Sequence, residues 1–181
     1  MTIRAVLTME HPALRQKAKK VRTFGPALQK LADDMLETMR AAPGIGLAAN
    51  QVGVLLRVIV VELPQEDENP QSGKPYVVIN PKIVKASREQ VEMEEGCLSV
   101  PGLVGDVWRA AEVTVKGRDV KGKPIRIKAR DLLARVFQHE IDHLNGILFI
   151  DRVESPDKIR RIVRPEEAET EEEREAVRAL I

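Results

Sequence analysis

Two histidines in the C-terminal half of the chain have the spacing of a metal site. His139 and His143 flank Glu140 in the pentapeptide HEIDH, and the chain has only three histidines. Residues four apart lie on one face of a helix, so both imidazoles could reach one cation. Glu140 would then lie beside the cation without binding it, where a carboxylate can move the proton of a water molecule. The pentapeptide predicts a catalytic metal centre, and the competing interpretation is a surface helix that contains two histidines by chance.

A catalytic site of this kind needs a third protein ligand and one open position. The metzincin pattern HExxHxxGxxH continues as far as Gly146, but its last position is Phe149, which cannot bind a cation. A gluzincin would use a downstream glutamate, but the available ones lie in a strongly charged stretch with few apolar neighbours, namely Glu166, Glu167 and Glu169. Neither peptidase pattern therefore supplies a convincing third ligand.

Cys97 is the better candidate for the third ligand. It is the only cysteine in the chain, so an intrachain disulfide is excluded. A thiolate is a strong, soft donor to a divalent cation, and Gly96 and Pro101 indicate a tight backbone around it. A buried, unreactive thiol is the alternative interpretation and the commoner state of a single cysteine.

Two helices are expected from apolar periodicity. Residues 26–42 carry aliphatic side chains at helical spacing, with a proline in the first turn, and predict an N-terminal helix. A second helix is expected over residues 131–145, with Asp131 as its N-cap and Gly146 as its terminator. This second helix would carry both histidines and Glu140.

Strands are expected in the stretches that are rich in β-branched residues. Residues 54–63 and 76–80 predict buried strands separated by a polar surface loop, and residues 112–129 predict a hairpin. Strands followed by helices, without βαβ alternation, favour the α+β class. The predicted fold has antiparallel sheets packed around a central helix carrying HExxH, an N-terminal helix and a C-terminal helical tail.

Length and charge limit the remaining possibilities. The 181 residues fit one domain with a tail, here predicted as a catalytic domain over residues 1–153 and a charged helical tail over residues 154–181. The 29 lysines and arginines nearly balance 28 acidic residues, so the overall charge does not indicate specific DNA binding. The N-terminal stretch has no apolar run of signal-peptide length, and no stretch suits a membrane span, so we expect a cytoplasmic protein.

Three segments together resemble the motifs of the peptide deformylase family. GIGLAANQ (residues 44–51) resembles its first motif, EGCLS (residues 95–99) its second, and QHEIDH (residues 138–143) its third. They occur in the family's order, and the similarity extends from about residue 3 to Val153. The resemblance implies a metal-dependent hydrolase that removes the N-formyl group from the formyl-methionine of nascent polypeptides and releases formate.

The resemblance also implies roles for individual residues. Cys97, His139 and His143 would bind one divalent cation, with water in the fourth position. Glu140 would act first as general base and then as general acid. The Gln51 side chain and the Leu98 backbone N–H would donate hydrogen bonds to the oxygen of the tetrahedral intermediate, where fixed donors commonly contribute a few kcal/mol.

Substrate contacts are expected near the first motif and on the second helix. The resemblance implies that the backbone at Ile45 and Gly46 runs along the substrate peptide. An apolar set could line a pocket for the substrate's methionine side chain or pack in the core, and the sequence leaves both open; its members are Ile45, Met93, Leu132 and Val136.

Three charged residues near the predicted site have open roles. Glu95 and Arg109 could form an ion pair that braces the Cys97 loop, or an ordinary surface pair. Arg135 lies four residues before His139, where relatives often have an apolar residue. We expect its aliphatic part to cover the pocket while its guanidinium stays in water.

Members of the resembled family generally use Fe2+, and Zn2+, Ni2+ or Co2+ can occupy the same site. One Fe2+ per chain is therefore the favoured cofactor. Partners are expected to be N-formyl-methionyl nascent peptides and, through the C-terminal tail, the ribosome. The tail begins with a cluster of basic residues that could contact RNA, namely Lys158, Arg160, Arg161 and Arg164.

Overall fold

The structure, a computed structural model, describes residues 2–42, 44–65 and 70–162. Its two α-helices are α1 (Pro26–Ala41) and α2 (Asp131–His143). Its strands are β1 (Gly46–Ala48), β2 (Val58–Val61), β3 (Tyr76–Ala86), β4 (Gln90–Cys97), β5 (Val100–Ala110), β6 (Glu112–Arg118), β7 (Pro124–Arg130) and β8 (Ile159–Arg161).

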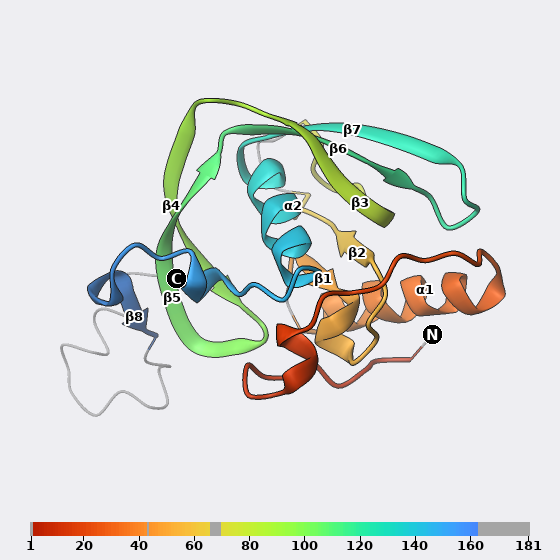
Figure 1. Ribbon diagram of the computed structural model, residues 1–181, viewed down its shortest axis with the longest axis horizontal. Coiled ribbons are helices and arrows are strands. Elements are labelled where there is room, and N and C mark those ends of the chain that lie inside the picture. The colour runs from red at the N-terminus through yellow and green to blue at the C-terminus, as the bar shows by residue number, and fades with distance from the viewer. Residues whose placement is uncertain (1, 43, 66–69, 163–181) are drawn as a thin grey trace.

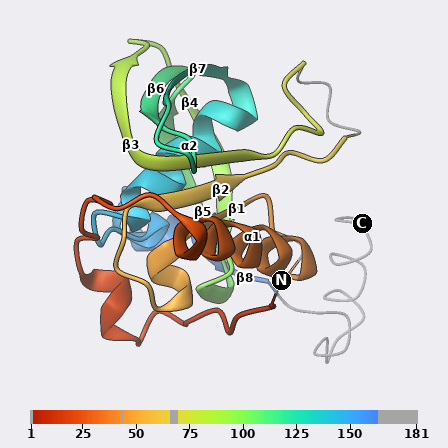
Figure 2. The ribbon, with the colours of Figure 1, turned by 90° about the vertical axis from the view of Figure 1, so that its right-hand side faces the viewer.

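The strands form two antiparallel sheets. One has five strands in the order β1-β2-β3-β6-β7, and the other has three in the order β4-β5-β8. In both views β6 and β7 lie near the top and α1 in the lower half, with α2 between them (Figures 1 and 2). The expectation of a mixed α+β fold with antiparallel sheets is confirmed.

Helix α1 follows its predicted range to within one residue. Pro26 occupies the first turn, where its missing N–H costs nothing. The apolar stripe packs into a core cluster with β2, and its members are Leu28, Leu31, Met35 and Met39. Burial of this stripe stabilises the helix more than intrinsic helix propensity does.

Helix α2 buries its own apolar stripe in the main core. Leu133 and Phe137 are fully buried, and the helix contacts β1, β2, β5, β6 and β7. Its chain reverses at Gly146, as predicted, where φ is 76° and a Cβ would come within 2.6 Å of the Arg15 carbonyl oxygen. Only glycine suits that conformation at that distance.

The predicted N-cap of α2 is wrong. Arg130 occupies the cap position without a side-chain hydrogen bond, and Asp131 is the first helical residue, with φ of 53°. The backbone N–H of Asp131 donates to the Ala111 carbonyl oxygen at 3.0 Å, which extends the β6–β7 pairing to the helix start. Strand β7 therefore runs directly into α2 and leaves no separate capping residue.

Strand boundaries differ from the expected ranges. The predicted hairpin is confirmed as β6 and β7, whereas the first predicted strand shortens to Val58–Val61 and the second extends to Ala86. The long β4–β5 hairpin was not predicted. Most residues of β4 are exposed, so the strand lacks the apolar alternation that sequence patterns detect.

The described start of the predicted helical tail is a short 3-10 helix, Pro156–Lys158, followed by a strand. Ile159–Arg161 form β8, which pairs with β5 at Leu103–Gly105, so this part of the expectation is wrong. Residues 163–181 lie outside the described part of the chain, and the boundary at Val153 stays a prediction. Among the described helices, none is long and apolar enough to span a membrane.

Candidate metal centre and active site

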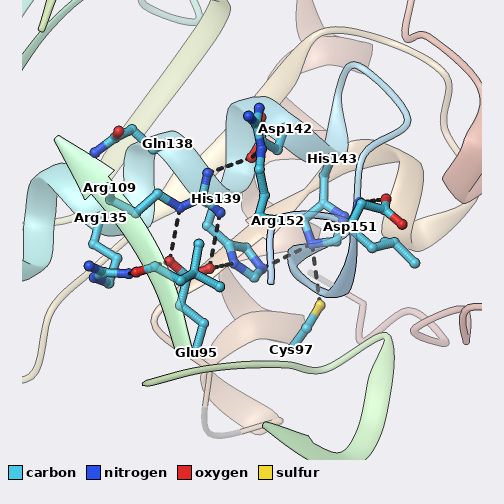
Figure 3. Close-up of polar contacts among 12 residues, drawn as sticks. Glu95, Cys97, Arg109, Arg135, Gln138, His139, Asp142, His143, Asp151 and Arg152 are labelled. Atoms are coloured by element: carbon cyan, nitrogen blue, oxygen red, sulfur yellow. Dashed lines mark hydrogen bonds and ion pairs between the residues drawn. The ribbon is translucent and has the colours of Figure 1, made fainter. Parts of the chain in front are cut away.

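Three side chains converge at the last turn of α2. His143 Nε2 lies 3.2 Å from Cys97 Sγ and 3.1 Å from His139 Nε2 (Figure 3). The three donor atoms all lie within 4.8 Å of one another. Ligands on a tetrahedral zinc-like ion are about 3.3–3.6 Å apart, given bond lengths of about 2.0–2.3 Å. The three donors therefore have the chemistry and the spacing of a one-cation site.

Two local structures bring these donors together. His139 and His143 are four residues apart on α2, so both imidazoles leave the same face of the helix. Cys97 ends β4, where the register with β5 shifts and Cys97 pairs with Val100 across a two-residue turn. The turn aims the thiol at α2, and sequence spacing alone could not predict this long-range contact.

Glu95 orients the first histidine. Its Oε2 lies 2.9 Å from His139 Nδ1, which leaves His139 Nε2 directed at Cys97 and His143. Carboxylates commonly hold metal-binding imidazoles in this manner. Arg109 and Arg135 in turn hold Glu95, with Nε and Nη2 of Arg109 at 2.9 and 3.0 Å and Nη1 of Arg135 at 2.7 Å.

The expected pair of Glu95 and Arg109 belongs to a larger buried cluster. Both side chains are about 5% exposed, so the surface-pair interpretation is wrong. Arg109 also donates one hydrogen bond to Asp142, which in addition receives a bidentate contact from Arg152 at 2.7 and 3.0 Å (Figure 3). Sequence reasoning missed Asp142, although its place inside HEIDH was a signal. The cluster connects β4, β5, α2 and the segment after it.

The surroundings of His139 favour positive charge. Burial opposes a charge on this imidazole, but hydrogen bonds to Cys97 and Glu95 outweigh burial and raise its pKa to about 10. Burial and the positive charges of His139 and Arg109 lower the pKa of His143. These shifts favour one bound proton, and so one positive charge, among the thiol and the two imidazoles. A metal cation can replace that proton.

Glu140 is buried beside the three donors and lines the same cavity. Burial raises its pKa to about 7, and the charge of His139 opposes this while that of Glu95 adds to it. Its Oε2 has no hydrogen-bond partner among the described residues. An unpartnered carboxyl group that ionises near neutral pH is suited to proton transfer.

Gln51 points its amide at the thiol. Its Nε2 lies 3.6 Å from Cys97 Sγ and donates to Ser99 Oγ at 3.0 Å, while its Oε1 accepts from the Ala48 N–H at 2.8 Å. These bonds fix the orientation of the amide. Ser99 therefore supports Gln51. Leu98 follows Cys97 in the turn and lines the cavity.

The cavity has a volume of about 470 Å³ and opens beside these groups. Ile45, Gly46, Leu132 and Val136 line it, and the first, third and fourth also pack against the core cluster. Met93 is not among the residues that line it, and its side chain is 43% exposed. The structure thus brings three of the four expected apolar side chains together.

Arg135 differs from its expected state. The residue is 5% exposed, and its guanidinium donates to the Val107 and Val91 carbonyl oxygens at 2.9 and 2.6 Å as well as to Glu95. The expectation that its head group stays in water is wrong, because three acceptors on β4 and β5 are within reach. Its side chain nevertheless lines the cavity.

Gly46 borders the cavity at a point of close approach. A Cβ there would lie 2.8 Å from Val136 Cγ1 and would collide with the Glu140 carboxylate. Any side chain at this position would therefore displace Glu140. Gly46 lies on β1, the edge strand of the five-stranded sheet, so backbone groups at this edge face the cavity.

Comparisons with known proteins agree with this geometry. The family profile of polypeptide deformylase matches residues 3–159. A peptide deformylase of Thermomicrobium roseum is 50% identical over 173 residues, which cover 95% of this chain and 97% of that protein. The crystal structure of the Thermotoga maritima peptide deformylase is 37% identical with a TM-score of 0.79, covering 86% of this chain and 100% of that one.

A third relative was solved with a peptide. The Met-Ala-Ser-bound structure of the class I type b peptide deformylase from Acinetobacter baumannii is 37% identical, with a TM-score of 0.79. It covers 84% of this chain and 100% of that one. The chain therefore belongs to the polypeptide deformylase family, whose members are hydrolases that act on N-formyl peptides.

Proposed function

We propose that Cys97, His139 and His143 hold the catalytic cation and that Glu140, Gln51 and Leu98 act on the formyl group of a nascent peptide. The convergence of one thiol and two imidazoles beside a buried carboxyl group carries this proposal. Peptide deformylases are metalloenzymes, and the donor set fits a single divalent ion. The remaining residues of the cavity would hold and orient the peptide.

The cation would supply a Lewis acid that makes a water molecule nucleophilic at neutral pH. A thiolate with two imidazoles suits several divalent ions, so availability decides occupancy as much as affinity does. We favour Fe2+, with Zn2+, Ni2+ and Co2+ as alternatives. An iron-loaded enzyme should lose turnover in air through oxidation of iron and of the Cys97 sulfur, whereas a nickel-loaded enzyme should persist. Equal survival of the two forms would contradict this assignment.

Glu140 would move the protons of the reaction. Its carboxylate takes a proton from the attacking water, and the resulting hydroxyl group bonds to the formyl carbon. Gln51 and the Leu98 N–H would donate to the formyl oxygen as negative charge develops there. Glu140 then gives its proton to the amine nitrogen, the carbon–nitrogen bond breaks, and formate leaves.

The peptide would lie along the edge of β1. Backbone groups at Ile45 and Gly46 would pair with the substrate backbone, in the manner of an added strand. Ile45, Leu132 and Val136, which line the cavity, would receive the methionine side chain. The Acinetobacter relative was solved with a peptide that begins with methionine, Met-Ala-Ser. The exposure of Met93 speaks against a role for it in the pocket of the free enzyme.

Ribosome association through residues 154–181 also stays a prediction. The described part of this segment argues against Lys158 and Arg160 as free RNA contacts. Lys158 contacts Glu92 and Glu154, and Arg160 pairs with Glu94 and Asp106. Both cations would have to leave existing carboxylates before they could bind phosphate.

The proposed specificity is tested by formate release from anaerobically purified enzyme. Formyl-Met peptides should be processed with a higher kcat/KM than matched formyl-Asp and formyl-Lys peptides, because the pocket is apolar. Val136→Asp should lower kcat/KM for formyl-Met more than Val115→Ala, a core change away from the cavity. Equal rates on the three peptides would mean that these side chains serve only the core.

A further inference from the structure

A row of positive charge covers the outer side of the five-stranded sheet. Successive residues of a strand point to opposite faces, and on β7 Ile125, Ile127 and Ala129 pack against the core cluster. The residues between them therefore point away from α2. We name as the cationic face five exposed, outward cations of β3, β6 and β7: Lys82, Lys85, Lys116, Arg126 and Lys128. Arg118 and Arg130 also point outward but are left out of the set, because each has another interaction.

Strand register places these charges side by side. Lys116 pairs with Lys82 on one side and with Arg126 on the other, which puts three cations in one row across three strands. Neighbouring strands are about 4.7–4.9 Å apart. Like charges directly opposite each other destabilise a sheet. This row therefore has an electrostatic cost within the folded protein.

No acidic side chain offsets this cost within the described part of the chain. None of the five cations takes part in an ion pair with a described residue. Glu112, which pairs with Arg130 in the register of β6 and β7, is the acidic residue at the end of the face. The basic residues near β8 differ, because Lys158 and Arg160 each contact two carboxylates.

The cationic face has a depression where β3, β6 and β7 lie next to residues 70–71, which precede β3. This depression of about 660 Å³ is lined by Lys85, Arg126 and Lys128, together with Thr114, Ser87 and one carboxylate, that of Glu112. Cations with small hydroxyl side chains between them are well suited to phosphate oxygens. None of the five cations lines the catalytic cavity.

We propose that the cationic face binds the phosphate backbone of double-stranded RNA. Five cations without an ion-pair partner among the described residues complement a polyanion, although the net charge of the chain is only +1. The outward positions of β6 and β7 are Glu112, Thr114, Lys116, Arg118, Pro124, Arg126, Lys128 and Arg130.

The types of side chain at those positions indicate which kind of polyanion the face binds. None of them is aromatic, and proteins that bind single-stranded RNA stack its bases on aromatic rings. None is a large apolar residue of the kind that anchors a protein in a lipid surface. Duplex RNA, which is recognised through its shape and phosphates, fits both observations.

The position of the face permits binding and catalysis together. Helix α2 lies on the inner side of β6 and β7, so the sheet separates the cationic face from the residues of the cavity (Figures 1 and 2). An RNA on the outer side would leave the cavity accessible to a peptide. The enzyme could thereby stay bound to structured RNA while it removes formyl groups from peptides.

The test uses the full-length, metal-loaded protein and a labelled RNA duplex of about 20 base pairs. Fluorescence anisotropy measures affinity between about 50 and 200 mM KCl. The variant Lys82→Gln/Lys116→Gln/Arg126→Gln should bind about tenfold more weakly or worse, and its slope of log affinity against log salt should fall by about 2–3. A matched control neutralises three exposed cations elsewhere, namely Lys17→Gln/Lys20→Gln/Arg161→Gln, and should change affinity less than about twofold.

Formate release and circular dichroism should be unchanged in both variants, which separates RNA binding from folding and catalysis. Absence of binding by the unaltered protein would overturn the proposal, as would equal weakening in the two triple variants. Stronger, face-dependent binding to phosphatidylserine vesicles than to the duplex would overturn the assignment to RNA.

Discussion

The two sides of the five-stranded sheet handle charge in opposite ways. On the inner side, between α2 and the β4–β5 hairpin of the other sheet, the buried cluster of Glu95, Arg109, Arg135 and Asp142 pairs every charge with at least one opposite charge. On the outer side, Lys82, Lys116 and Arg126 stand in one row without a described acidic partner. Both regions concentrate charge, but only the inner one neutralises it within the fold.

The difference shows what each side can do. Buried charges must be paired, because an unpaired one costs several kcal/mol, so the inner cluster is a rigid support for His139. Exposed charges are solvated and can stay unpaired, so the outer row is available to a ligand of opposite sign. Changes on the inner side should alter catalysis and stability, and changes on the outer side should alter neither by much.

The largest expected effect is on the inner side, at Glu140. Glu140→Gln keeps the shape of the side chain but removes the proton carrier, so kcat should fall by about 10²–10⁴-fold. Metal content should stay near that of the unaltered enzyme, because Glu140 is proposed not to bind the cation. Formate release and metal analysis measure the two effects. A variant that loses its metal as completely as Cys97→Ser would contradict the proposed division of roles.

The pH profile tests the same group. Burial raises the pKa of Glu140 to about 7, and a general base must be ionised, so kcat/KM should rise as pH increases toward 7. A bound cation favours the ionised form of Glu140, so in the metal-loaded enzyme the rise in kcat/KM should occur at lower pH. The residual activity of Glu140→Gln should lack the rise, and an identical pH profile in that variant would assign it to another group.

The next largest effect is expected at Glu95. Glu95→Ala would leave Arg109 and Arg135 buried without their shared carboxylate, which should lower the free energy of unfolding by about 3–5 kcal/mol. It should also weaken metal binding about 10–100-fold through His139. Urea denaturation and metal titration measure the two losses. The outer-side control Glu112→Ala should change stability by less than about 0.5 kcal/mol, and an equal loss there would remove the contrast between the sides.

Arg135 should show a smaller, mixed effect. Arg135→Leu leaves the Val91 and Val107 carbonyl oxygens without this donor, but Arg109 still pairs with Glu95, so we expect a loss of about 1–3 kcal/mol in stability. Because Arg135 lines the cavity, KM for formyl-Met peptides should change more than kcat. A change confined to kcat would indicate that Arg135 acts mainly through Glu95 and His139.

The smallest effect is expected on the outer side. Lys116→Gln removes the middle charge of the row and should raise the free energy of unfolding by about 0.2–1 kcal/mol at low salt. The gain should vanish at high salt, where exposed charges are screened. Lys158→Gln is the control, because it removes a paired cation and should not stabilise. A stability loss in Lys116→Gln would mean that the cationic face already has partners within the protein.

Much of the fold and the site followed from local patterns. The helix over 26–41, the β6–β7 hairpin and the helical pair of His139 and His143 each depend on periodicities of a few residues. The β4–β5 hairpin and the strand at Ile159 escaped prediction, because their exposed residues pair with partners that local pattern does not identify. The buried state of Arg135 was missed for the same reason, since its acceptors lie 28–44 residues away.

The sequence by itself determined the chemistry: one thiol, two imidazoles four residues apart, a neighbouring carboxyl group and three motifs of one family. These depend on residue type and short spacing, which a sequence displays directly. Only the tertiary structure decided that Glu95 is buried among two arginines and a histidine, while Lys82, Lys116 and Arg126 stand in one row without a described acidic partner. The free-energy cost of a charged side chain depends on its burial and on its partners in other elements. Both arise from contacts between distant parts of the chain.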